Sequence, residues 1–366
     1  MMNPDELLAA TEFPERDQPA APTLATQRFK FTGSGSEYFR IWIVNLFLTI
    51  VTLGIYSAWA KVRRTRYFYD NTVLAGSSFD YHGTPASILR GRIVALLFFG
   101  AYTVARLVSE TTGAVALLVL GLLLPWLIWK SLQFKLYNSN YRGIRFGFGG
   151  TARKAYFVYL LLPILSLLSL YLLAPLAHQR IKKFQHEHSR FGSTPFSFHA
   201  GAGGFYKIYL IVFVLAVCGL FAIGALFGAP LAAIAKTRTA SVNPTMLGLI
   251  AFFVLALYVW MFLLLPLLHT MVQNLVWNNT RLGKHRFASN IGVRKMTWIA
   301  VTNLAGIILT LGLFIPFAQV RAMKYRIESL TLLPGGSLDD VVDATQEKAS
   351  ATGEGAADLL DFDLSL

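Results

Sequence analysis

The fold is set by residues 53–83, which read LGIYSAWAKVRRTRYFYDNTVLAGSSFDYHG. This stretch closes an apolar segment and ends where aromatic residues alternate with polar ones between glycines. Between these parts lies a basic collar of four cations: Lys61, Arg63, Arg64 and Arg66. Cations and aromatic residues at the end of an apolar helix are typical of a membrane interface. We therefore expect an apolar helix, a basic collar and then a short extended segment.

The same pattern recurs along the chain. Leu53–Arg63 aligns without a gap on Leu311–Arg321, and the same offset pairs Asn45 with Asn303. The extended segment recurs in copies that begin at Asn71, Asn138, His188 and Asn279. Aromatic residues two apart lie on one face of a strand, and glycine allows the turn that follows. Each copy is therefore predicted to be a small hairpin or clip at the interface, and the chain carries a degenerate internal repeat.

Composition indicates a membrane protein. Hydrophobic residues make up 55% of the 366 residues, charged residues 14%, and the mean hydropathy is +0.51, unlike a soluble globular chain. A helix needs roughly 20 mostly apolar residues to cross a bilayer. Segments that reach or approach this length are Ile41–Ala60, Ile93–Val108, Ala114–Trp129, Ala155–Ala177, Ile208–Ala235, Met246–Leu268 and Trp298–Ala318. We predict an all-α polytopic membrane protein of about seven apolar helices, with short extended aromatic and glycine segments at the interface.

The two flanks differ from this core. Residues 1–28 contain four prolines and five acids, and the chain from Glu328 onward has nine acids against Lys348 alone. Such composition is typical of disordered tails, predicted here at 1–28 and 333–366. The membrane domain is expected at 29–332. Its repeat units are about 29–150 and 151–290, with a partial unit at 291–332.

The core is strongly basic. Between Tyr38 and Ile327 it has 29 Lys or Arg and four acids. Because these cations lie at the ends of apolar segments, the expected partners are the lipid bilayer and anionic phospholipid headgroups, and no nucleic acid. The lone cysteine, Cys218, excludes an internal disulfide. The oligomeric state stays open.

Two topologies compete for the single segments, which are the first, fourth and seventh. If all seven cross with the C-terminus in the cytoplasm, 18 Lys or Arg lie inside and 14 outside, a poor fit to the positive-inside rule. If the three single segments are re-entrant or interfacial, every collar falls on one side, and 30 cations oppose the two in residues 236–244. The length of the segments favours seven crossings, whereas charge favours the one-sided arrangement.

Several motifs carry a family resemblance: GSGSEYF at 33–39, Trp42, TLGIYSAWAKVR at 52–63, RYF at 66–68, NT at 71–72 and YHG at 81–83. They closely resemble the YjgN family of bacterial inner-membrane proteins, over about Phe29–Leu332. The resemblance implies a multi-pass protein in the inner membrane of a Gram-negative bacterium, and we expect a cytoplasmic C-terminus. It supplies no reaction, substrate or catalytic residue. The acidic C-terminal tail lies outside it.

Two sets of residues are candidates for a site. Asn45 and Asn303 could line a polar path between repeats, or they could simply hold neighbouring helices together. A collar for anionic lipid or solute would use Lys61, Arg63, Arg64, Arg66, Lys130, Arg180 and Arg321. Cations beside interfacial aromatic residues suit anionic headgroups. The collars could converge only in the one-sided topology.

Signatures of catalysis and metal binding are weak. His186, His188 and His199 could form a metal set, but His188 takes the place of Asn71 in the repeat, and nearby cations oppose a metal. The sequence has no nucleophile elbow, phosphate loop with lysine or paired zinc motif. We predict no enzyme, catalytic residue, metal site or cofactor.

Two functions fit these features. One is a channel or facilitative carrier for a small solute, such as an anion, with its site between inverted halves. The alternative is a non-transporting scaffold or anionic-lipid-binding protein. A carrier requires a polar cavity near the bilayer midplane, whereas a scaffold should be dry there.

Overall fold

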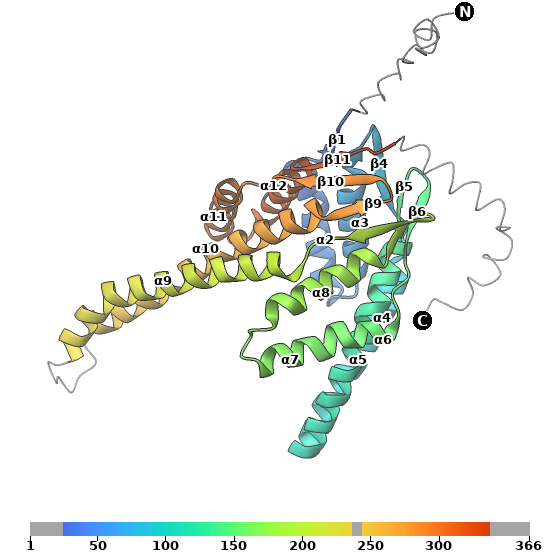
Figure 1. Cartoon of the computed structure of the whole chain (residues 1–366). Helices are drawn as coiled ribbons and strands as arrows, with labels where there is room; N and C mark the ends of the chain where they lie inside the picture. The colour runs from blue at the N-terminus through green and yellow to red at the C-terminus, as the bar shows by residue number, and fades with distance from the viewer. Residues whose placement is uncertain (1–24, 236–243, 337–366) are drawn as a thin grey trace, which may run out of the picture.

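The computed structural model describes residues 25–235 and 244–336, which form five successive units with the order strand, helix, helix, strand (Figure 1). Unit one comprises β1 (Gln27–Arg28), β2 (Lys30–Phe31), α2 (Gly35–Val51), α3 (Ser57–Asp70) and β3 (Thr72–Leu74). Unit two comprises β4 (Ser77–Tyr81), α4 (Pro85–Val108), α5 (Glu110–Tyr137) and β5 (Ser139–Tyr141).

Unit three comprises β6 (Ile144–Phe148), α6 (Ala152–Tyr156), the π-helical η2 (Phe157–Leu161), α7 (Leu162–Leu168), α8 (Ala174–Glu187) and β7 (Ser189–Phe191). Unit four comprises β8 (Thr194–Phe198), α9 (Ala202–Ala235), α10 (Pro244–Asn278) and β9 (Thr280–Leu282). Unit five comprises β10 (His285–Ser289), α11 (Val293–Leu309), α12 (Ile315–Glu328) and β11 (Leu330–Leu333).

The strands of all five units form one antiparallel sheet that curls into a near-barrel. Its order in the described chain is β1-β11-β10-β9-β8-β7-β6-β5-β4-β3-β2. The two end strands, β1 and β2, are separated only by Phe29, whose N–H donates to the carbonyl of Leu330 at 3.2 Å. Residues 27–31 therefore pair with β11 on one edge and with β3 on the other, which joins the two ends of the sheet.

Short turns with positive φ connect the units. Ala75 and Gly76 have φ of 47° and 78°, and Arg142 and Gly143 have 50° and 78°. Two consecutive residues with positive φ favour a two-residue hairpin turn, and glycine adopts that conformation at no steric cost. The predicted hairpins therefore exist, and each one also pairs with its neighbours in the common sheet.

Three units have short helical hairpins with the same tip. The chain reverses at Leu53-Gly54, Leu170-Tyr171 and Leu311-Gly312, and all six residues have positive φ. In the first tip, the Thr52 hydroxyl donates to a carbonyl of α2 and accepts the N–H of Tyr56 at 2.9 Å. Thr310 and Ser169 make the corresponding bonds in the other two. One polar side chain therefore satisfies backbone groups that the reversal leaves unpaired.

Two units have long helical hairpins. In the described residues, four helices are long and apolar enough to cross a membrane: α4, α5, α9 and α10. No more than 11% of the most apolar window of each is buried within the chain. In Figure 1 these pairs project from the sheet end in different directions. Their apolar side chains therefore face outward, as helices surrounded by lipid do.

The prediction of an all-α protein with about seven crossing helices is wrong. The fold is mixed, because the extended segments assemble into one sheet, and the described chain has four candidate spans. The apolar segments Ile41–Ala60, Ala155–Ala177 and Trp298–Ala318 each contain a reversal, so each makes two short helices that return to the sheet. Continuous hydrophobicity does not reveal a turn that is itself apolar: Leu53 and Leu311 at two tips are each 95% exposed.

The start of the repeat is a helix cap. Ser34 of the GSGSEYF motif accepts the N–H of Glu37 at 3.2 Å and caps α2, while Thr84 and Thr151 cap α4 and α6 in the same way. A hydroxyl at this position satisfies one of the free N–H groups of the first turn. The tails predicted at 1–28 and 333–366 lie mostly outside the described residues, although β1 begins at Gln27 and β11 ends at Leu333.

Accessibility of single cysteines tests the re-entrant hairpins. In a Cys218→Ala background, exposed positions Ser78 and Ser193 lie at the sheet end, and exposed Thr111 lies at the tip of the hairpin formed by α4 and α5. A membrane-impermeant maleimide is applied to intact cells. It should label either both Ser78→Cys and Ser193→Cys or Thr111→Cys alone, and the unlabelled positions should react only after the cells are permeabilised. Labelling of Ser78→Cys and Ser193→Cys from opposite sides would restore seven crossings.

The tip geometry predicts a position-specific cost at glycine. Gly54 has φ of 91°, and a Cβ added there would have no neighbour within 4 Å. Gly54→Ala should therefore destabilise the protein by about 1–2 kcal/mol through backbone strain alone. Gly91, inside α4, is equally open but has no positive φ. Gly91→Ala should be neutral or stabilising. Thermal unfolding in detergent measures both, and equal effects of the two changes would argue against the strained tip.

Candidate functional site

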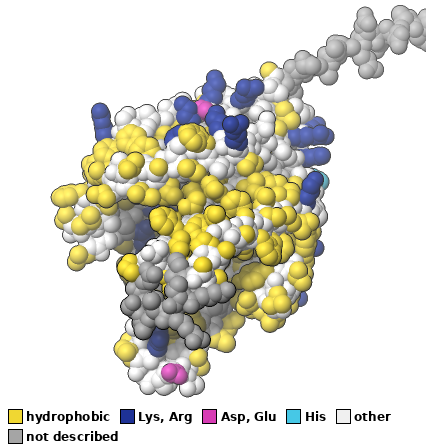
Figure 2. Space-filling view, turned by 90° about the vertical axis from the view of Figure 1, so that its left-hand side faces the viewer, with side chains coloured by type: hydrophobic (Ala, Val, Ile, Leu, Met, Phe, Trp, Pro, Cys, Tyr) yellow, Lys and Arg dark blue, Asp and Glu magenta, His cyan; other side chains and the backbone are white. Residues whose placement is uncertain are grey.

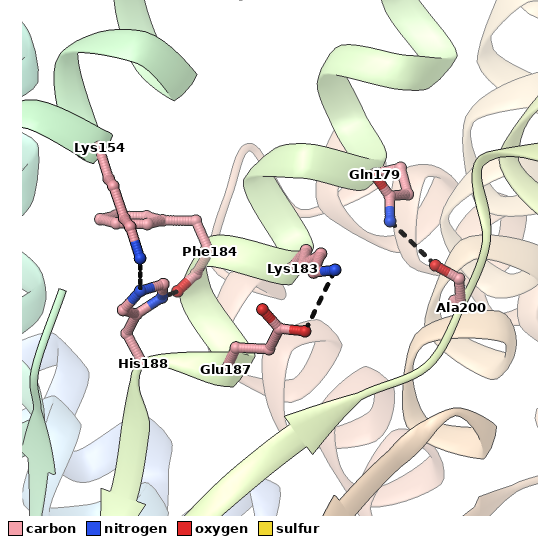
Figure 3. A network of polar contacts seen from close by, with 7 residues as sticks. All are labelled: Lys154, Gln179, Lys183, Phe184, Glu187, His188 and Ala200. Carbon is pink, nitrogen blue, oxygen red and sulfur yellow. Dashed lines mark hydrogen bonds and ion pairs between the residues drawn. The ribbon is translucent and has the colours of Figure 1, made fainter.

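Each second helix ends at a polar side chain that returns to its own backbone. The side-chain amides of Asn71, Asn138 and Asn279 each donate to the carbonyl four residues earlier at 2.8 Å. His188 makes this contact at 3.0 Å and Ser329 at 2.6 Å (Figure 3 shows His188). These five cap residues occupy the same place in the five units. They fix where each helix ends and its strand begins, and hence the level of every side chain below.

Counting back from the caps places four cations at one level. Arg63, Lys130, Arg180 and Arg321 each lie eight residues before the cap of their unit, and only unit four differs, with Met271. We call these four residues the cation ring. Neighbouring units are in contact around a closed circuit through α3–α4, α5–α6, α8–α9, α10–α11 and α12–α2. The four predicted positions therefore lie at the same distance along their helices from the caps, in units that are neighbours around the circuit.

The cation ring has no acidic partner among the described residues. The two side-chain ion pairs among the described residues, Lys183–Glu187 at 3.4 Å and Lys324–Glu328 at 3.9 Å, lie next to the caps. Lys130 lies over the ring of Trp129 at 4.9 Å. Arg321 donates to Thr302 Oγ1 at 2.8 Å. Aromatic and hydroxyl contacts orient these cations without neutralising them, so their charge stays available to an anion.

The other predicted collar residues lie beside Arg63. Lys61, Arg64 and Arg66 are exposed on α3, and Arg66 Nε donates to the carbonyl of Tyr81 at 3.1 Å. Arg66 therefore helps to join α3 to β4. Figure 2 shows Lys and Arg gathered at the sheet end of the molecule, above a broad band of hydrophobic side chains.

The two predicted asparagines do not contact each other through their side-chain amides. Asn303 donates to the carbonyl of Ala318 at 3.1 Å and accepts from Arg321 at 3.3 Å, so it joins α11 to α12. Asn45 is buried in α2, and its Oδ1 has no hydrogen-bond partner among the described residues. No hydrogen bond links the two amides in this part of the chain. The geometry around Asn303 is that of a residue that holds two helices together.

A second feature lies inside the sheet. Five phenylalanines, one from each unit, face its interior: Phe29, Phe79, Phe146, Phe196 and Phe287. Successive rings are stacked, with centroids 6.2–6.5 Å apart from Phe29 to Phe287. They surround a cavity of about 420 Å³ that continues to the last turns of α3, α5, α10 and α12. We call this space the aromatic chamber.

Sequence reasoning did not find the chamber or the lysine that lines it. Lys135 lies three residues before its cap and is exposed while lining the chamber; Arg326 occupies the same position in unit five. Lys182, six residues before its cap, is half-buried, and burial, followed by repulsion from Lys135, lowers the pKa of its ammonium group. Counting back from the polar residues that begin each copy would have placed Lys135 and Arg326 at the same position.

Comparison with known protein families identifies the family of this chain. Residues 26–359 match the family described as bacterial protein of unknown function (DUF898). The chain belongs to the DUF898 family. This match runs past Leu332, where we expected the resemblance to end, into the acidic tail.

Relatives of this DUF898 chain include the inner membrane protein YjgN of Salmonella typhimurium strain LT2, at 36% identity over 141 residues. The inner membrane protein YjgN of Escherichia coli K12 is 35% identical over 142 residues. Each alignment covers 37% of this chain, and the chain spans 35% of each relative's length. No solved structure matches it.

The histidines of this DUF898 chain have separate surroundings. His188 caps α8 and contacts Lys154 at 3.1 Å (Figure 3), whereas His199 is exposed. His186 is packed against Trp277 and Phe198 and lies 3.2 Å from Thr280 Oγ1. Among the described residues no three potential ligands converge on a metal position. His188 therefore has the capping contact that its place in the repeat suggested.

His186 gives the protein a pH-dependent stability. Burial, followed by repulsion from Lys182, lowers the pKa of its imidazole from 6.5 to about 4. The contribution of His186 to the free energy of unfolding is therefore present above the unfolded-state pKa. It is lost as pH falls from about 6.5 to 4, because only the unfolded state gains the proton in this range. Replacing the half-buried imidazole by a ring that cannot titrate, in His186→Phe, should make the melting temperature depend less on pH over this range. His199→Phe, at the exposed site, serves as control; equal profiles for wild type and His186→Phe would contradict the prediction.

Proposed function

We propose that this DUF898 chain is a multi-pass protein of the bacterial inner membrane that binds anionic phospholipid headgroups through the cation ring. The observation that carries this proposal is the placement of four cations from four units at one depth, without an acidic partner in the described chain. The names of its relatives support the inner-membrane location. Headgroups of the surrounding leaflet would supply the missing anions.

Helix lengths support a headgroup level at the cation ring. Along α5, 20 residues separate Glu110 from Lys130, which is about 30 Å, the thickness of the hydrocarbon core. Six residues of helix separate Ser57 from Arg63, so the first re-entrant tip reaches about 10 Å beyond the ring. This is less than half the bilayer plus headgroups, which suits the exposed leucines of the tips. The sheet then lies outside the membrane.

Charge supports a cytoplasmic position for the sheet. All collars lie at the sheet end, and the whole chain has 30 Lys or Arg in that group against two in residues 236–244. Short cytoplasmic segments carry such an excess of cations, and the cytoplasmic leaflet presents anionic lipid. We therefore propose that the ends of the described chain, including the segment that follows β11, face the cytoplasm.

A channel or facilitative carrier fits this arrangement less well. The inverted halves on which that hypothesis depended are not supported, because three of the five helical hairpins are too short to cross and reverse early. The spans α4, α5, α9 and α10 keep their apolar faces exposed. Asn303 is engaged within its own hairpin. We accordingly propose a non-transporting, non-enzymatic role that uses no cofactor.

Native mass spectrometry of the full chain with equal amounts of phosphatidylglycerol and phosphatidylcholine tests the proposal. The protein should retain phosphatidylglycerol preferentially. The triple change Arg63→Gln, Arg180→Gln, Arg321→Gln should reduce this preference by about fivefold per cation, because each contributes about 1 kcal/mol beside an anionic surface.

The matched control is Arg145→Gln, Arg190→Gln, Arg281→Gln, which removes the same charge from exposed positions on the strands. These strand positions lie about two helical turns above the cation ring, so lipid preference should persist. An equal loss in both triple variants, or no preference in the wild type, would refute the proposed site.

A further inference from the structure

The aromatic chamber has no part in binding headgroups at the cation ring. It lies inside the sheet, above the level of Arg63 and Lys130, and its walls are the phenylalanines of the five units together with Leu74, Tyr141, Phe191, Leu282 and Leu332 from the partner strands. Water gains little from such walls, whereas a hydrocarbon chain makes close contacts with them. An apolar cavity of this kind is a preferred place for a small ligand.

Most polar side chains of the chamber lie at the end formed by the helices. This end carries Lys135 and Tyr69 with Thr72 and Ser139, the first residues of β3 and β5. In the sheet wall the hydroxyl of Tyr141 is already used, since it donates to the carbonyl of Leu74 at 2.6 Å. Ser139 donates to the carbonyl of Lys135 at 2.7 Å and lies 3.1 Å from Tyr69 Oη. Because Lys135 is exposed and also lines the chamber, the chamber reaches the surroundings at this end.

Positive charge at this end is uncompensated. No ion pair in the described chain involves Lys135, which lines the helical end of the chamber together with Tyr69 and Ser139. An anion at this end would accept a charge-assisted hydrogen bond from the ammonium group of Lys135.

We infer that the aromatic chamber binds one hydrocarbon chain that bears an anionic head group, with the chain among the phenylalanines and the head group at Lys135. A long-chain carboxylate and a lysophospholipid with an anionic head share this chemistry. The site differs from the cation ring, which faces the headgroups of the bilayer. Its ligand is enclosed by the sheet.

Photolabelling tests this site on the full chain in vesicles of phosphatidylcholine alone, which offers the cation ring no anionic lipid. The probe is palmitate with a diazirine at its terminal carbon. Adducts are expected on inward-facing strand residues such as Phe196 and Leu282. Oleate should reduce labelling at least tenfold, and oleyl alcohol at the same concentration should not, since a charge-assisted contact is worth about a factor of ten or more.

Two lysines on the same helix separate this proposal from the function proposed above. Lys135→Gln should lower chamber labelling about tenfold without changing phosphatidylglycerol preference, whereas Lys130→Gln, in the cation ring, should do the reverse. Lys135 is exposed, so the change leaves the fold intact, and an unchanged melting temperature verifies this.

The outcomes are decisive in both directions. Competition by lysophosphatidylglycerol as well as oleate would support a bilayer-derived ligand, and competition by oleate alone would support a free fatty acid. Adducts confined to the outward faces of α4, α5, α9 and α10 would overturn the proposal. Equal competition by oleyl alcohol, or undiminished labelling of Lys135→Gln, would overturn it as well.

Discussion

Pairing of backbone groups between very short strands is the interaction on which the whole molecule depends. The strands of the described chain have two to five residues, too few for a hairpin to be stable alone in water. Each hairpin becomes stable only because the next unit covers its edge. With residues 27–31 joining β11 to β3, no long edge is left open, which removes the usual hazard of exposed strand edges. The five phenylalanines then bury themselves in the interior.

Closure of the sheet also sets the geometry of the helices. Each cap residue holds the end of its second helix against the start of a strand. Second helices of different length therefore all end at the same level, next to the sheet. That level explains why Arg63 and Arg321 match in depth although 258 positions separate them in the chain. It also explains why short and long hairpins coexist: the sheet fixes only where a helix starts, and the apolar sequence decides how far the hairpin extends.

Local patterns in the sequence were informative, and long-range ones were not. The alternation around Phe79 and the glycine at 76 predicted a hairpin, and such hairpins form. The long apolar runs of α9 and α10 indicated helices correctly. Pairing between neighbouring hairpins could not be predicted, because each such contact involves only three residue pairs. The tips were also missed, since Leu53 and Gly54 continue the hydrophobicity of α2 while their backbone reverses direction. Arg180 and Lys130 were recognised as collar residues, but their common depth depends on caps whose hydrogen bonds the sequence does not display.

The seam at Phe29 has a consequence for biosynthesis. A ribosome makes residues 27–31 among the first of the ordered chain, yet one of the two strands that flank them, β11, is completed only at Leu333. The N-terminal strand must therefore wait, paired on one side, until almost the whole polypeptide has emerged. Such late closure over about 300 residues is a contact of very high sequence separation, which makes it a slow step of folding. Units two and four are complete in sequence before β11 is made, so the long hairpins are available for insertion before the sheet can close.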